Sequence, residues 1–139
     1  MSTTYQLTRP ARVRMTVYQG STFHHKFLFR LGDDPFPFTD GFGLSDWRAR
    51  MHVRETLDAP GCLLNLTTEN GRLELFATGA ESGWHVRLSA EDTEALPAPT
   101  DAVYDLELVR ESDGFVLRVQ EGTVRVIPEV TRGECEVVE

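Results

Sequence analysis

The sequence predicts an all-β fold, because apolar and polar residues alternate through most of the chain and turn-forming pairs separate the alternating runs. The clearest run covers residues 47–54, in which Trp, Ala, Met and Val alternate with three arginines and a histidine. Such a strand has one dry face and one wet, basic face. The runs together predict about nine short strands, at the spacing of a β-sandwich or barrel: 13–17, 23–31, 47–53, 64–66, 73–77, 84–88, 104–108, 115–119 and 124–126.

Two dipeptides carry the turn signals. Asn70-Gly71 predicts a type I′ hairpin between the strands on either side of it, since both turn positions need positive φ. Asp113-Gly114 predicts a second hairpin before Phe115.

Residues 89–96 form the one stretch with a helical pattern. Ser89 is suited to cap the first turn, Asp92 follows three residues later as in a capping box, and Pro97 ends the helix. We therefore expect one short crossover helix near residues 89–96.

Length and composition predict a single domain over residues 1–139, with short flexible ends near 1–9 and 133–139. The chain is 40% hydrophobic and 26% charged, which is close to an average globular protein. It shows neither a signal-peptide pattern nor the ~20 apolar residues of a membrane span. Its net charge of −8 disfavours a nucleic-acid partner, because phosphate binding needs a concentrated basic surface. We expect partners that are proteins or small ligands, and neither nucleic acid nor membrane.

The two cysteines belong to no metal or redox motif. Cys62 stands in an apolar run and fits the role of a small core residue, whereas Cys135 lies in a polar tail. We expect both thiols to be reduced, with a disulfide between them as the alternative.

The segment 32–43 is a candidate protein-contact loop. It contains three glycines, two prolines and three phenylalanines, Phe36, Phe38 and Phe42. A loop of this length usually has a function, and exposed aromatic residues are typical of protein interfaces. The alternative is that the three rings fold back and close one end of the sandwich.

A row of arginines on one strand face is the second interface candidate. Arg48, Arg50 and Arg54 share the wet face of their strand. They either pair across the sheet with carboxylates such as Asp105 and Glu107, or form a docking face for an acidic neighbour.

No catalytic or metal-binding motif is recognisable. The sequence has no phosphate loop, nucleophile elbow or HExxH pair, and we expect neither enzymatic activity nor a cofactor. Adjacent His24 and His25 must face opposite sides of a strand. His52 and His85 lie on different strands and could become neighbours, but without a third ligand we expect no metal site.

Taken in order, several motifs resemble a group of small bacteriophage and prophage tail or baseplate virion proteins. The resemblance runs from about Val13 to Arg132, and departs from the family at Asp46, where a turn glycine is usual, and in the longer 32–43 loop. The chain is also similar to the immunoglobulin-like N-terminal module of phage baseplate upper proteins. This resemblance implies an antiparallel β-sandwich of about 7–9 strands. The motifs are 17–23 (VYQGSTF), 44–54 (LSDWRARMHVR), 71–73 (GRL), 88–97 (LSAEDTEALP), 104–108 (YDLEL), 121–124 (EGTV) and 128–132 (PEVTR).

The resemblance implies a structural virion protein of the tail, baseplate or tail-fibre attachment region. Such a protein acts as an adaptor in several copies, in the virion tail after assembly and in the host cytoplasm before it, with other tail, fibre or spike proteins as partners. A carbohydrate- or receptor-binding module on the same sandwich is the first alternative, and it requires Trp47 and Trp84 to be exposed. A capsid decoration protein is the second.

Overall fold

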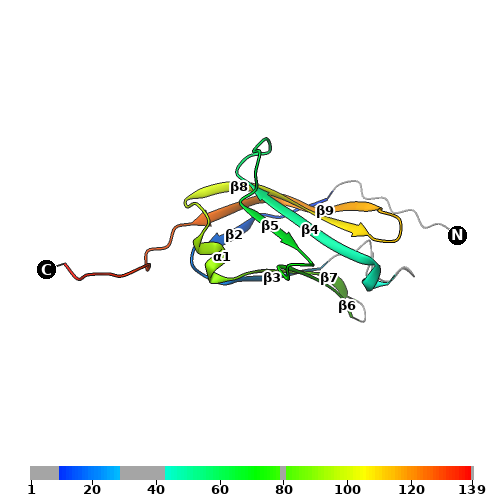
Figure 1. Ribbon diagram of the computed structural model, residues 1–139, viewed down its shortest axis with the longest axis horizontal. Helices are drawn as coiled ribbons and strands as arrows, with labels where there is room; N and C mark the ends of the chain where they lie inside the picture. Colours follow the sequence, from blue (N-terminus) through cyan, green and yellow to red (C-terminus); the bar gives the residue numbers. More distant parts are fainter. Residues whose placement is uncertain (1–9, 29–42, 79–80, 139) are drawn as a thin grey trace.

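Two β-sheets packed face to face form the structure, which is a computed structural model describing residues 10–28, 43–78 and 81–138 (Figure 1). The first sheet has the strand order β1-β9-β8-β4-β5, and β2 also pairs with β9; the second has the order β3-β7-β6. The predicted all-β sandwich is confirmed. Its elements are β1 (Ala11–Arg12), β2 (Met15–Tyr18), β3 (Phe23–Leu28), η1 (Leu44–Asp46), β4 (Trp47–Arg54), β5 (Leu64–Thr67), β6 (Leu73–Thr78), β7 (Glu81–Leu88), α1 (Ala90–Glu94), β8 (Thr100–Arg110) and β9 (Val116–Ile127).

Strand β9 differs from the prediction in two ways. It runs unbroken through the two predicted strands 115–119 and 124–126, because Gly122 keeps an extended path and stays in register with Tyr104. It also pairs in parallel with β1 and β2, whereas all other strand pairs given for the structure are antiparallel. Alternating sequence patterns identify strands but carry no information on the direction of a pairing between distant segments.

The predicted Asn70-Gly71 hairpin is wrong. The turn carries the chain from β5 in the first sheet to β6 in the second, so the flanking strands do not pair with each other. Gly71 has positive φ but Asn70 does not, which excludes type I′ geometry. The Asn70 side chain instead accepts hydrogen bonds from the backbone N–H groups of Thr67 and Arg72, at 3.0 and 3.1 Å.

Helix α1 confirms the predicted crossover and its cap. The backbone N–H of Asp92 donates to Ser89 Oγ, and the N–H of Ser89 donates to Asp92 Oδ2, each at 3.0 Å. This capping box begins the helix with only Ser89 between it and the end of β7. The helix therefore carries the chain from the second sheet back to β8 in the first.

The core lies between the sheets and includes both tryptophans. Trp47 is 5% exposed and Trp84 is 2% exposed. Trp84 Nε1 donates to Gln120 Oε1 at 2.9 Å, and Gln120 Nε2 donates to the Tyr104 hydroxyl at 2.9 Å. That hydroxyl donates in turn to the carbonyl of Val13 at 2.7 Å, so one buried chain of hydrogen bonds joins the two sheets. Burial raises the pKa of the Tyr104 hydroxyl, which keeps it a donor.

The two chain ends were predicted to be flexible. Residues 131–138 are all exposed and leave the sandwich at the end where α1 lies (Figure 1). Residues 1–9 and 139 lie outside the described part of the chain. Among the described residues, none of the helices has the length and apolar character needed to cross a membrane.

Candidate functional site

One end of the sandwich gathers residues from three distant segments. Gln19 lies in the turn after β2, and its Nε2 donates to the carbonyl of Leu96 at 2.9 Å. Its Oε1 accepts a hydrogen bond from the backbone N–H of Glu129 at 3.0 Å. Gln19 thereby ties the segment after α1 and the segment after β9 to the same turn.

The neighbouring Gly20 adds a second connection to this end. Its N–H donates to Thr93 Oγ1 at 3.0 Å, and the same hydroxyl donates to the carbonyl of Ser21 at 2.9 Å. Thr93 is fully buried. Gly20 has a φ of 84°, and a Cβ on it would overlap the carboxylate of Glu129. The positive φ favours glycine in this turn, whereas the Glu129 carboxylate, at the end of a flexible side chain, could move to admit a Cβ.

We call this group, Gln19, Gly20, Thr93, Leu96 and Glu129, the exit clamp, because residues 130–138 leave the domain directly after it. Its members come from three of the motifs that carry the family resemblance: 17–23, 88–97 and 128–132. The sequence alone does not indicate that these three motifs lie together. The partners are 73 to 110 residues apart in the chain, and a single sequence holds no signal for such distances.

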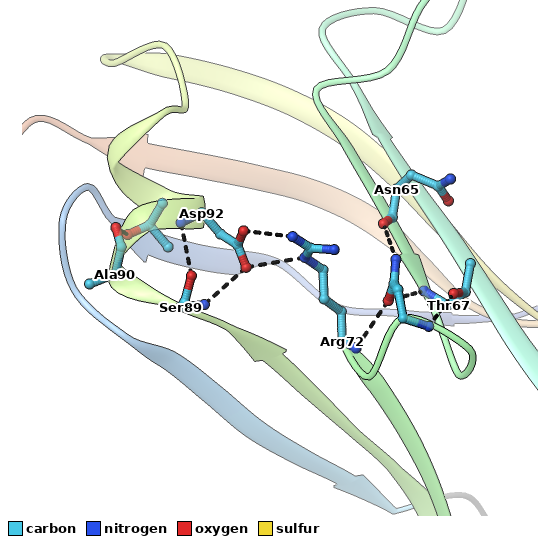
Figure 2. A network of polar contacts seen from close by, with 8 residues as sticks. Asn65, Thr67, Arg72, Ser89, Ala90 and Asp92 are labelled. Atoms are coloured by element: carbon cyan, nitrogen blue, oxygen red, sulfur yellow. Dashed lines mark hydrogen bonds and ion pairs between the residues drawn. The ribbon is translucent and has the colours of Figure 1, made fainter.

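A salt bridge between Arg72 and Asp92 holds α1 to the turn between the sheets (Figure 2). Asp92 directly precedes Thr93 of the exit clamp. Arg72 binds Asp92 through two hydrogen bonds, Nη2 to Oδ1 at 2.7 Å and Nε to Oδ2 at 3.1 Å. Because Asp92 also closes the capping box with Ser89, one carboxylate stabilises both the helix and its contact with the turn. The hydrogen bonds from Arg72 contribute most to lowering the pKa of the Asp92 carboxyl, to about 2.

We expect Asp92→Asn to lower the free energy of unfolding at pH 7 by about 1–2 kcal/mol, since water screens this partly exposed pair. An unfolded carboxyl titrates near pH ~4 and the folded one near 2. The contribution of Asp92 is therefore complete above pH ~4 and is lost as the pH falls from ~4 to 2. Urea unfolding between pH 2 and 7 measures it. The wild type should lose this increment on acidification and the variant should not.

Asp101→Asn is the matched control, because Asp101 forms an ion pair with Arg125 in which both side chains are well exposed. Its expected effect at pH 7 is at most a few tenths of a kcal/mol. Equal losses in the two variants would contradict the role given to the Arg72–Asp92 pair.

Of the six residues predicted to form interfaces, the structure describes the three arginines but not the three phenylalanines. Arg48, Arg50 and Arg54 lie on β4, on the face of the first sheet that points away from the core. Phe36, Phe38 and Phe42 lie outside the described residues. Arg50 pairs with its register partner Glu107 at 2.8 Å, as the cross-strand interpretation predicts, and Arg48 pairs with Glu111 at 2.8 Å. Arg54 donates instead to the carbonyl of Ala59 and to His52 Nδ1.

The outer face of the first sheet has a hollow at the end of β4. Its cavity volume is about 590 Å³, and Leu57 in the loop after β4 stands at its rim with 85% exposure. Three arginines and two carboxylates line it: Arg12, Arg54, Arg118, Asp105 and Glu121. Asp105 and Glu121 face each other across β8 and β9, so the arginines beside them offset a like-charge contact.

The ion pairs inside this hollow are long. Arg118 lies 3.5 Å from Asp105 and 3.7 Å from Glu121, and Arg12 lies 3.5 Å from Glu121. Arg54 lines the same hollow and forms no ion pair with any carboxylate of the described residues. This contrasts with Arg48 and Arg50, which come earlier in β4 and each lie 2.8 Å from a carboxylate.

The histidines that the structure brings together are His24 and His85, and His52 is not one of them. His52 lies in the first sheet and His85 in the second, so these two are not neighbours. His85 contacts His24 on the adjacent strand, with His24 Nε2 and His85 Nδ1 at 3.0 Å. Burial is the main cause that lowers the pKa of His85. His25 points to the other side of β3, where its ring stacks between Phe23 and Phe27.

Two further expectations can be compared with the described residues. In that part of the chain, histidine, cysteine and acidic side chains nowhere gather in threes as a metal site requires. Cys62 and Cys135 are free and exposed, so the core role expected for Cys62 is wrong. The apolar run that contains Cys62 belongs to the loop before β5, where Cys62 lies two residues ahead of the strand.

Comparison with known proteins adds no family to these observations. No protein-family description matches the sequence, and no curated protein is similar to it.

Proposed function

We propose that this protein is a structural component of a bacteriophage or prophage virion. It belongs to the tail, baseplate or tail-fibre attachment region and acts as an adaptor through protein–protein contacts, in several copies. In this proposal the sandwich is an immunoglobulin-like module similar to that of phage baseplate upper proteins. The partners are other tail, fibre or spike proteins, and the chain passes from the host cytoplasm into the virion during assembly.

The exit clamp is the observation that carries the proposal. Three motifs of the phage-like series supply its residues, and their hydrogen bonds hold the point where residues 130–138 leave the domain. A domain that works by attachment needs a rigid body and a segment that leaves it at a defined place. The hydrogen bonds between the three motifs make the body rigid at this end and fix the point where the segment leaves it. None of these motifs supplies a nucleophile with a neighbouring base.

The carbohydrate-binding alternative loses the feature it requires. Trp47 and Trp84 are buried between the sheets, and a buried ring offers no stacking surface to a sugar. We therefore retain the adaptor function.

Mass spectrometry of purified particles tests the proposal. After gradient purification of particles from the encoding phage or induced prophage, the protein should copurify at a fixed ratio to the major tail protein. A host cytosolic protein of similar abundance in the lysate is the control and should be removed. Intact, infectious particles that lack the protein would refute a structural role.

A further inference from the structure

We infer that the arginine-lined hollow on the first sheet binds the acidic segment 133–138 of a second copy of this chain. The inference rests on the proposed role in a multi-copy assembly and names the contact that joins the copies.

The hollow has a local excess of positive charge on an acidic protein. Arg12, Arg54 and Arg118 supply three positive charges against the two negative charges of Asp105 and Glu121, whereas the whole chain carries −8. Arg54 lacks a carboxylate partner among the described residues, and the pairs of Arg118 are 3.5 and 3.7 Å long. A carboxylate that enters the hollow would offer Arg118 a closer acceptor than its present partners and give Arg54 a carboxylate in addition to Ala59 and His52.

The segment 133–138 has the complementary chemistry. It contains Glu134 and Glu136, followed by Val137 and Val138, which are 83% and 92% exposed. In extended chain two glutamates at this spacing lie on one side, about 6.6 Å apart, which suits arginines from neighbouring strands. Val138 lies on the same side as the two glutamates and can then contact Leu57 or Val103, the apolar side chains of the hollow.

In the structure the segment lies clear of its own domain and is free to contact another copy. Residues 131–138 are exposed throughout, and Figure 1 shows them running away from the sandwich. The nine residues 130–138 can reach about 30 Å from the exit clamp. Because the segment and the hollow are different surfaces, each copy can accept one neighbour and reach another. Such head-to-tail contacts form rings or filaments.

A charge exchange in the full-length chain tests the contact by analytical ultracentrifugation at low and at physiological salt. The wild type should associate reversibly, and more weakly as salt rises. The hollow variant Arg54→Glu/Arg118→Glu should associate at least about tenfold more weakly, since two contacts become repulsive. The variant of the acidic segment, Glu134→Arg/Glu136→Arg, should show the same loss of association.

A mixture of the two variants gives the decisive result. The negative hollow of the first variant then meets the positive segment 133–138 of the second, and the unaltered hollow of the second meets the unaltered segment of the first. Association should therefore recover. The matched control is Arg87→Glu/Arg125→Glu. It makes the same change in charge at two arginines outside the hollow, each held in an ion pair of 3.0 Å or less, and should associate like the wild type.

Three results would overturn the inference: a wild type that stays monomeric at all concentrations, variants that associate normally, or a mixture that fails to recover. Circular dichroism of each variant excludes unfolding as the cause of a loss. The proposed function is judged separately by the composition of particles. A chain that is present in virions but fails the charge exchange keeps its function and loses this contact.

Discussion

Replacing Trp84 with alanine is expected to lower the free energy of unfolding by about 4 kcal/mol, the largest loss from a single side chain in the core. The indole is 2% exposed and lies on the central strand of the second sheet. Its removal leaves a large cavity and also takes the Nε1 donor away from Gln120. Urea unfolding followed by circular dichroism measures the loss, which is a large part of the ~5–15 kcal/mol typical of a domain.

Two variants separate the contributions to this loss. Trp84→Phe keeps most of the ring and removes the hydrogen bond, so its cost should be about half that of alanine. Tyr18→Ala removes an aromatic side chain that is 60% exposed and should change stability by no more than about 0.5 kcal/mol. A Trp84→Ala protein within 1 kcal/mol of the wild type would show that the indole does not occupy the core.

This expectation also bears on the carbohydrate-binding alternative. A glycan-binding test that relies on Trp84→Ala is informative only if the variant keeps its fold. Because Trp84 joins the two sheets through Gln120, a loss of binding in that variant would report a loosened sandwich. Exposed aromatic residues such as Tyr18 are the appropriate positions for such a test.

The residues that face the core could be predicted from the sequence for a simple reason. The alternation in β4 places Trp47, Ala49, Met51 and Val53 inward, and all four are buried. A strand with one buried face has a period of two, so local sequence is enough to assign the faces. The same holds for α1, whose capping box lies within four consecutive residues.

Pairing between distant segments could not be predicted in the same way. The Asn70-Gly71 pair indicates a turn, but whether β5 and β6 then pair or separate into two sheets depends on the partners β4 and β7. The exit clamp could not be predicted for the same reason, because its residues come from distant segments. Gln19 is an ordinary polar residue until Leu96 and Glu129 come within hydrogen-bonding distance of it.

The arginine row shows how far a local pattern leads towards a site. Its face and the Arg50–Glu107 pair follow from alternation and cross-strand charge balance. The hollow could not be predicted from that local pattern, because Arg12 and Arg118 reach it from β1 and β9. No feature of the sequence indicated the parallel pairing of β1 with β9.

Gly122→Ala is expected to lower the free energy of unfolding by about 3 kcal/mol. Gly122 has a φ of 154°, and a Cβ on it would overlap the carbonyl oxygen of Val13. This carbonyl accepts the hydrogen bond of the Tyr104 hydroxyl, and the Val13 N–H donates to the backbone carbonyl of Glu121 at 2.9 Å. The methyl group therefore strains the backbone and pushes Val13 away, which weakens two hydrogen bonds of about 1 kcal/mol each.

Gly71→Ala separates the backbone strain from the displacement of Val13. Gly71 also has positive φ, at 79°, but a Cβ there would meet nothing within 4 Å, so its cost should be the backbone strain of about 1–2 kcal/mol alone. Urea unfolding gives both losses, and amide hydrogen exchange at Val13 should accelerate in the Gly122 variant only. Equal losses at the two glycines would mean that Val13 is not held against β9. If the losses differ as expected, the close approach of Val13 to Gly122 adds to the parallel pairing that holds β1, and with it Arg12, beside β9 and the arginine-lined hollow.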